Sequence, residues 1–140
     1  MASSTQFTLQ IVSADRSIVN ETVDEVEIPG SEGYFGVLPG HTPLLALIGT
    51  GELWYRQGAT TSYVSLSGGF AEVQPDRVTI LAQIAERADE IDIARAEAAK
   101  RRAEERLHSS APDMDFERAR IALLKSLIRL QVATRARVRG

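Results

Sequence analysis

The sequence predicts a mainly β chain with added α-helices: an N-terminal β-sandwich, or flattened barrel, followed by a C-terminal antiparallel two-helix hairpin. In the first part, many short apolar stretches alternate with turn residues and no helical segment separates them, a pattern typical of sandwiches. From about Glu86, apolar residues recur every three or four positions, as they do in amphipathic helices. We therefore expect a β-sandwich domain at residues 1–86 and a helical hairpin domain at residues 87–140.

The charge of the chain changes at the same place. Residues 1–85 hold three basic and nine acidic side chains, whereas residues 86–140 hold thirteen and ten, which together make the 16 and 19 of the whole chain. Such asymmetry between two halves indicates two modules with different partners.

The expected strands alternate apolar and polar residues. Phe7, Leu9 and Ile11 point to one face of the first strand, as in a half-buried strand. Gly68 and Gly69 interrupt a later apolar stretch and predict a sharp corner, because glycine permits positive φ. The other expected strands are VEI, YFGVL, LLALI, ELWYR, TSYVSLS, FAEV and RVTILAQ.

The two expected helices differ in how much of their surface is apolar. Asp89 is expected to cap the first helix and Asp113 or Asp115 the second, and the segment HSSAPD breaks the pattern between them. The second helix is apolar over more of its circumference than one partner helix can cover, so it needs a further surface to bury it. The first helix carries Ile93, Ala96, Ala99, Ala103 and Leu107 on one face; the second carries Phe116, Ala119, Leu123, Leu127 and Leu130, flanked by Ile121, Leu124, Ile128 and Val132.

Several classes of function are excluded or disfavoured by the composition. The chain has no cysteine, which excludes disulfides, cysteine nucleophiles and thiolate metal sites. His41 and His108 lack a second ligand at metal spacing, and no motif of a hydrolase or phosphate-binding loop is present. We expect no catalytic residue and no metal site. The N-terminus lacks the pattern of a signal peptide, and Leu44–Ile48 is too short to span a bilayer, so any membrane connection is expected to run through partners.

Basic residues form a stripe on one face of each expected helix. Folded antiparallel, the stripes could flank one groove, and guanidinium forks in such a groove would suit a polyphosphate. The alternative is a solvated, salt-bridged helix surface, as most charge runs are. The first stripe holds Asp92, Arg95, Arg102 and Arg106 around Ala99, and the second holds Arg118, Lys125 and Arg129 around Ala122.

Over nearly its whole length, the chain resembles the epsilon subunit of bacterial F-type (rotary) ATP synthases. The segment VDEVEIPGSEGYFGVLPGHTPLLALIGTGEL is similar to the family's region around a Gly-x-x-Pro-Gly-His-x-Pro turn. The stretches SGGFAEV, VTILAQIAERADEID and DFERARIALLKSLIRL follow in the family's order and spacing. The family's ATP-binding motif, Ile/Leu-Asp-x-x-Arg-Ala, is present as Ile91–Ala96.

The resemblance implies a non-catalytic, regulatory subunit of the central stalk. Its sandwich would contact the gamma subunit and the membrane rotor (c) ring. Its hairpin would switch between a folded form and a form extended into the alpha and beta subunits of the catalytic head, which inhibits ATP hydrolysis. ATP, with or without Mg²⁺, would bind the folded hairpin as a regulatory ligand without being hydrolysed. The expected location is peripheral, on the cytoplasmic face of the bacterial plasma membrane.

The resemblance also assigns expected site residues. Lys125 stands where the family pattern has the first of two arginines, and Tyr34 stands where some relatives carry an acid. The expected nucleotide-binding residues are Glu86, Ile91, Asp92, Arg95, Ala96, Arg102, Lys125 and Arg129. The expected rotor-ring contacts are Glu32, Tyr34 and His41.

An alternative from another class is a β-sandwich adaptor whose basic hairpin binds nucleic acid. Basic residues along the second helix could follow a phosphate backbone. The acidic sandwich and the scarcity of aromatic residues in the hairpin, where Phe116 stands alone, argue against it. We therefore expect no nucleic-acid partner.

Overall fold

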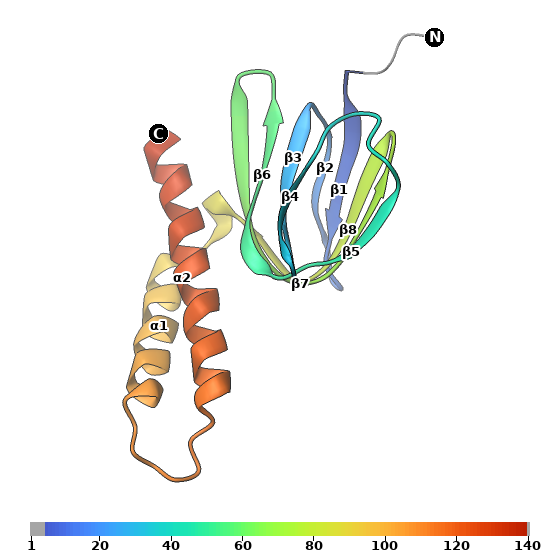
Figure 1. Cartoon of the computed structure of the whole chain (residues 1–140). Helices are drawn as coiled ribbons and strands as arrows, with labels where there is room; N and C mark the ends of the chain where they lie inside the picture. The colour runs from blue at the N-terminus through green and yellow to red at the C-terminus, as the bar shows by residue number, and fades with distance from the viewer. Residues whose placement is uncertain (1–4, 140) are drawn as a thin grey trace. The chain divides into compact units, whose positions relative to one another are not determined.

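The computed structural model describes residues 5–139, with side chains described up to residue 136. The chain forms two compact units, Met1–Arg87 and Ala88–Gly140. The first consists of β-strands and the second of helices, which confirms the predicted fold class (Figure 1). Within the described residues, no helix has the length and apolar character needed to cross a membrane.

The first unit contains eight strands. β1 and β8 pair in parallel, and all other pairs are antiparallel. Pairing runs in the order β2-β1-β8-β7-β6-β3-β4, and β5 also pairs with β7. The strands are β1 (Phe7–Val12), β2 (Ser17–Val23), β3 (Glu25–Gly30), β4 (Gly33–Val37), β5 (Leu44–Leu47), β6 (Thr50–Gln57), β7 (Thr60–Gln74) and β8 (Arg77–Arg87).

The longest strand, β7, belongs to both layers of the sandwich. Its first half pairs with β6 from Thr60 to Ser67, and its second half pairs with β5 from Phe70 to Val73. Gly68 and Gly69 lie between the halves with φ values of 76° and 118°. Because only glycine adopts such angles readily, these two residues let one strand bend from one layer to the other. The predicted corner is confirmed.

The core lies between the layers and is apolar. The alternation predicted for the first strand is confirmed, because Phe7, Leu9 and Ile11 are buried while the residues between them are half-buried. Leu53 and Ile80, on β6 and β8, are fully buried in the same cluster. Burying a large aliphatic side chain contributes about 1.5–3 kcal/mol, so this core can hold the first unit folded by itself.

The second unit is a helical hairpin. A 3-10 turn, η1 (Ala88–Glu90), leads to α1 (Ile93–Leu107), and α2 (Phe116–Arg139) packs against α1 in the opposite direction. Asp115 caps α2, because its Oδ1 accepts the Arg118 N–H at 3.0 Å, which confirms one of the two predicted caps. The predicted cap at Asp89 is wrong. Residues 88–90 form the 3-10 turn, and Asp92, in an extended conformation, accepts the Arg95 N–H at 3.0 Å instead.

The seam between the helices is built from small residues. On α1, Ala96 and Ala103 are fully buried, and on α2, Ala119, Ser126 and Ala133 are almost fully buried. The broad apolar character of α2 leaves a second set of side chains exposed to 40–47%, namely Phe116, Ile121, Leu124 and Leu127. The expectation was that the sandwich or another protein covers this face; no described part of this chain covers these four residues, so a partner protein remains the expected cover.

The corner of β7 gives a direct test of the fold. A Cβ on Gly69 would overlap the Leu81 carbonyl oxygen and lie 2.9 Å from Ala82 Cα. The backbone of Gly69 also has a conformation that residues with a side chain rarely adopt. Backbone atoms of a neighbouring strand cannot move aside cheaply, so we expect Gly69→Ala to lower the free energy of unfolding by at least about 2 kcal/mol. Urea unfolding followed by the fluorescence of Trp54, the single tryptophan, measures this.

Gly36→Ala is the matched control, because Gly36 has no positive φ and a Cβ added there would meet no atom within 4 Å. We expect it to change stability by less than about 0.5 kcal/mol. Equal urea midpoints for the two variants would contradict the role assigned to the corner.

Candidate functional site

The cationic stripes of the two helices lie on the same side of the hairpin. Four cations each stand one residue before a buried residue of the seam. One residue corresponds to about 100° of rotation about the helix axis, so each cation is displaced from the seam by this angle, in the same direction relative to its own helix. When two helices pack antiparallel, equal rotation from the seam brings both stripes to one side. The pairs of cation and seam residue are Arg95–Ala96 and Arg102–Ala103 on α1, and Arg118–Ala119 and Lys125–Ser126 on α2.

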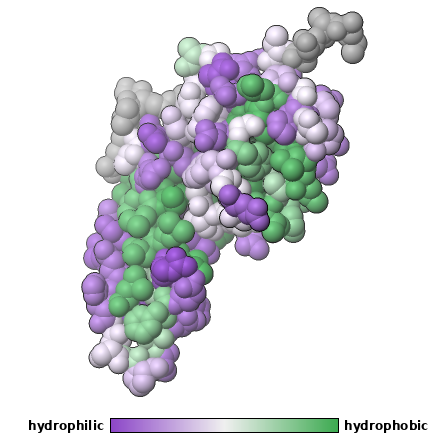
Figure 2. Space-filling model, viewed as in Figure 1, coloured by the Kyte–Doolittle hydropathy of each residue, from purple (hydrophilic) through white to green (hydrophobic). Residues whose placement is uncertain are grey.

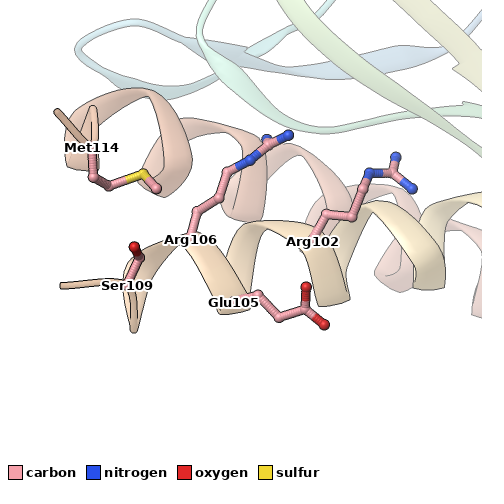
Figure 3. A pocket seen from close by; sticks show the side chains of 5 residues that line it. All are labelled: Arg102, Glu105, Arg106, Ser109 and Met114. Carbon is pink, nitrogen blue, oxygen red and sulfur yellow. The ribbon is translucent and has the colours of Figure 1, made fainter. Parts of the chain in front are cut away.

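Two hollows at the loop end of the hairpin show this arrangement directly. One of about 360 Å³ is lined by Arg102 and Arg106 of α1 together with Met114. The next, of about 300 Å³, is lined by Arg106, Met114 and Arg118 of α2. Figure 3 shows Arg102 and Arg106 extending to the same side of α1. These hollows bring cations of both helices together at the loop end, whereas the groove predicted around Ala99 and Ala122 stays a prediction.

Most cations of the stripes have no carboxylate partner. Among the described side chains, none of Arg95, Arg102, Arg106, Arg118 and Lys125 makes an ion pair or a side-chain hydrogen bond. Arg120 behaves differently: its Nε donates to Glu117 at 3.2 Å, and this hydrogen bond lowers the pKa of Glu117. A salt-bridged helix surface, the alternative considered for these residues, therefore describes Arg120 but not these five cations. Unpaired guanidinium groups on one side of a hairpin can bind a polyanion.

The other expected nucleotide residues divide into packing and polar positions. Ile91 and Ala96 are buried, so their side chains contribute packing. Asp92 is exposed and holds the first turn of α1 through the Arg95 N–H. Arg129 is half-buried on α2. Glu86 belongs to the first unit, where it lies half-buried on β8 opposite Ser65.

The three expected rotor-ring residues do not form one cluster. Glu32 lies in the turn between β3 and β4, next to Ser31, whose N–H donates to the Leu47 carbonyl at 2.9 Å. His41 lies in the β4–β5 connection, beside Gly40, whose N–H donates to the Pro75 carbonyl at 2.8 Å. These turns stand at opposite ends of β4, because the strand is extended and spans about 13 Å between its first and last residues (Figure 1).

The Tyr34 side chain links β4 to β6 by a hydrogen bond. Its hydroxyl accepts the Glu52 N–H at 3.0 Å. Pro29 lies opposite Tyr34 on β3, and its carbonyl accepts the Gly49 N–H at 2.8 Å. The Tyr34 hydroxyl lies over Gly51, because a Cβ there would collide with it. Half of the Tyr34 surface is exposed, but its hydroxyl is committed to the backbone of β6.

An exposed apolar row crosses the outer face of the sandwich, and the sequence analysis did not predict it. Leu47, Phe70 and Leu81 are register partners on β5, β7 and β8, and each is more than half exposed. The signal was present in the alternation, because Phe70 and Leu81 stand next to the inward-facing Ala71 and Ile80. Figure 2 shows apolar surface on the sandwich as well as along the hairpin. A continuous apolar row on a solvent-exposed surface marks an interface.

Comparisons with known proteins agree on one family. A family model described as the beta-sandwich domain of the ATP synthase delta/epsilon chain matches residues 6–88. The model for the long alpha-helix domain of the same chain matches residues 89–134.

Individual relatives agree with the family models. The ATP synthase epsilon chain of Syntrophobacter fumaroxidans is 50% identical over 125 residues, covering 89% of this chain and 93% of the relative. That of Nitratidesulfovibrio vulgaris is 48% identical over 124 residues, covering 89% and 92%. Among solved structures, a chain of the Euglena gracilis mitochondrial ATP synthase (OSCP/F1/c-ring) matches with a TM-score of 0.80 and 27% identity, covering 96% of this chain and 84% of that one.

A chain of the Tetrahymena thermophila mitochondrial enzyme, from its central stalk and c-ring, matches with a TM-score of 0.53 over 96% of this chain and 98% of that one. At 12% identity this match supports the fold alone. Sequence, fold and relatives lead to the same result: the chain belongs to the ATP synthase delta/epsilon family, as an epsilon-type subunit of the central stalk.

Proposed function

We propose that this chain is a non-catalytic regulatory subunit that joins the gamma subunit to the membrane rotor ring and restrains ATP hydrolysis through its hairpin. ATP binds the folded hairpin without being hydrolysed and favours that form. The observation that carries the proposal is the pair of cationic stripes on one side of a small-residue seam, in which Arg95, Arg102 and Lys125 make no ion pair with any described residue. The nucleic-acid adaptor considered as an alternative gains no support, since the relatives are named ATP synthase epsilon chains.

In this proposal the two helices bind one nucleotide together. Arg95 and Arg102 of α1 and Lys125 and Arg129 of α2 supply cationic donors for the phosphates, with or without Mg²⁺. Asp92 is exposed at the start of α1, where its second carboxylate oxygen can accept from a hydroxyl or amino group of the nucleotide. The other expected residues have smaller parts: Ala96, fully buried in the seam, leaves room for the helices to approach closely, and Glu86 stands just before the hairpin, at the end of β8.

The exposed apolar face of α2 can stabilise a second, extended form of the hairpin in which it is buried. Phe116, Ile121, Leu124 and Leu127 are apolar yet exposed in the folded hairpin. In the extended form this face packs against the alpha and beta subunits of the catalytic head, and burial there stabilises the inhibitory state. A ligand that binds the folded form alone then shifts the population away from inhibition.

The sandwich provides the contacts to the rotor. The row of Leu47, Phe70 and Leu81 supplies an apolar surface for the gamma subunit, and the turn at Glu32 contacts the polar loop of the ring subunit. Tyr34 supports that contact from within the sheet, by fixing the end of the hairpin formed by β3 and β4. The subunit is thereby held, through its partners, at the cytoplasmic face of the bacterial plasma membrane.

The first prediction tests the inhibitory role of the hairpin. A chain that ends after Ala88 retains the whole sandwich, so it should still assemble and support proton-coupled synthesis. The assembled enzyme should hydrolyse ATP at least about fivefold faster than with the full chain. A fivefold change corresponds to a coupling free energy of about 1 kcal/mol, the low end of the typical range. Steady-state hydrolysis measured with both chains decides it, and equal rates would refute an inhibitory hairpin.

The second prediction concerns ATP binding to the isolated full chain. Arg95→Ala removes one unpaired cation and keeps the helix propensity, so calorimetric titration should show ATP binding weakened about tenfold or more. Arg101→Ala is the matched control, because Arg101 is also exposed on α1 but lies about 120° away from the stripe. We expect it to bind ATP as the wild type does.

Lys125→Arg extends the same titration. An arginine at this half-buried position replaces a point charge by a planar fork, and we expect about fivefold tighter ATP binding. If Arg95→Ala and Arg101→Ala bind ATP equally well, the nucleotide site lies elsewhere.

The third prediction uses the absence of native cysteine. A cysteine in place of Glu32 should cross-link to a cysteine in the polar loop of the ring subunit, whereas one in place of His41 should not, because the two turns lie at opposite ends of β4. Cross-linking yield in assembled membranes is the measurement. The reverse pattern would place the opposite end of the sandwich against the ring.

A further inference from the structure

The loop end of the hairpin carries cations that the proposed nucleotide site does not use. Arg106 lines both hollows there, and Arg118 lines the second of them together with Arg106. Neither residue belongs to the nucleotide set proposed above, and neither has an ion-pair or side-chain hydrogen-bond partner among the described residues. Arg102 lines the adjoining hollow and is the one member that both groups share.

Two carboxylates also line these hollows, and neither makes an ion pair with the arginines. Asp115 Oδ1 accepts the Arg118 N–H at 3.0 Å, so one of its two oxygens caps α2. Figure 3 shows the carboxylate of Glu105 directed away from the guanidinium groups of Arg102 and Arg106. The C-terminal end of α1 and the N-terminal end of α2 meet here, and their dipoles oppose each other. Together the hollows hold three arginines and two carboxylates, so their side chains leave a net positive charge.

We propose that Arg106 and Arg118, with Arg102, form a second anion site that binds a small phosphate-class oxyanion, such as inorganic pyrophosphate. Each guanidinium group can bind two oxygens of such an anion, so arginines from two helices together can bind more of its oxygens than a single exposed arginine can. The hollows, of about 300 and 360 Å³, are open to solvent and have room for it. Ser109 lines the first hollow and adds a hydroxyl donor.

The site is distinct from the nucleotide residues, and the inference does not depend on them. Arg106 lies eleven residues after Arg95, which places it about 16 Å further along α1. Arg102 lies between Arg95 and Arg106 and belongs both to the proposed nucleotide residues and to the second anion site. An oxyanion bound at the loop end therefore contacts the same guanidinium group that binds a nucleotide phosphate. Pyrophosphate should therefore weaken ATP binding through Arg102 without occupying the Arg95 end of the groove.

Met114 offers a probe at the site itself, because it lines both hollows and the chain has only one other methionine, Met1. In full-length protein labelled with ¹³C at the methionine methyl groups, pyrophosphate should shift the Met114 signal along a saturable curve. Sodium chloride at matched ionic strength should leave it unmoved, since screening alone does not fill a site. Arg106→Gln and Arg118→Gln should each weaken pyrophosphate binding at least about fivefold.

Two controls separate this site from general charge and from the nucleotide site. Arg120→Gln removes the same charge from α2, but Arg120 is already paired with Glu117, so pyrophosphate binding should be unchanged. Arg95→Ala should also leave it unchanged, even though it weakens ATP binding. Loss of binding in Arg95→Ala with retention in Arg118→Gln would mean that pyrophosphate occupies the nucleotide residues, and the second site would be refuted. Equal effects of Arg106→Gln, Arg118→Gln and Arg120→Gln would refute it as well, as would a Met114 signal that does not saturate.

Discussion

The close contact of α1 and α2 over small residues is the constraint on which the hairpin and its sites depend. Ala96 and Ala103 meet Ala119, Ser126 and Ala133 along the seam, and all five are buried. Side chains of this size let two backbones approach closely. That approach brings the cations that precede Ala96, Ala103, Ala119 and Ser126 to one side of the hairpin. A leucine seam would separate the helices, and the same arginines would then face water individually.

The same seam makes the hairpin easy to rearrange. Burial contributes about 0.8 kcal/mol per methylene-sized group, and Val132 is the only large aliphatic side chain that is fully buried on the described part of the two helices. This seam therefore stabilises the pair less than the leucine and isoleucine core stabilises the sandwich. Meanwhile Phe116, Leu124 and Leu127 remain exposed on α2. The helix thus has a weak partner on one face and an unburied apolar surface on another. Two packings of such a helix can lie within a few kcal/mol of each other, which is the range in which a ligand shifts a population.

The fold could be predicted from local patterns, and the errors arose where tertiary context decided. Alternation predicted the strands, and Gly68-Gly69 predicted the corner, because both depend on neighbours in sequence. The cap at Asp92 was missed because a 3-10 turn intervenes at residues 88–90, and sequence spacing alone does not distinguish it from the first helical turn. His41 was grouped with Glu32 because both lie in loops that match the family's expected ring contacts, and only the structure shows that an extended strand separates the two loops. The Tyr34–Glu52 hydrogen bond joins residues that lie 18 positions apart in the sequence. It depends on how β4 and β6 are arranged in the sheet, and the periodicity of the sequence does not reveal that arrangement.

The unpaired cations also act on the folded hairpin when it is empty. Like charges on both helices repel one another, and among the described residues no carboxylate makes an ion pair with Arg95, Arg102, Arg106, Arg118 or Lys125. In the function proposed above, this repulsion opposes the close approach that the small seam residues allow, so the folded form would be least stable without a bound anion. A polyanion between the stripes would remove the repulsion and add charge-assisted hydrogen bonds, both in the folded form alone. Differential stabilisation of one form is the thermodynamic requirement for a ligand-controlled switch, and in that proposal the same guanidinium groups provide both the recognition and the instability that recognition relieves.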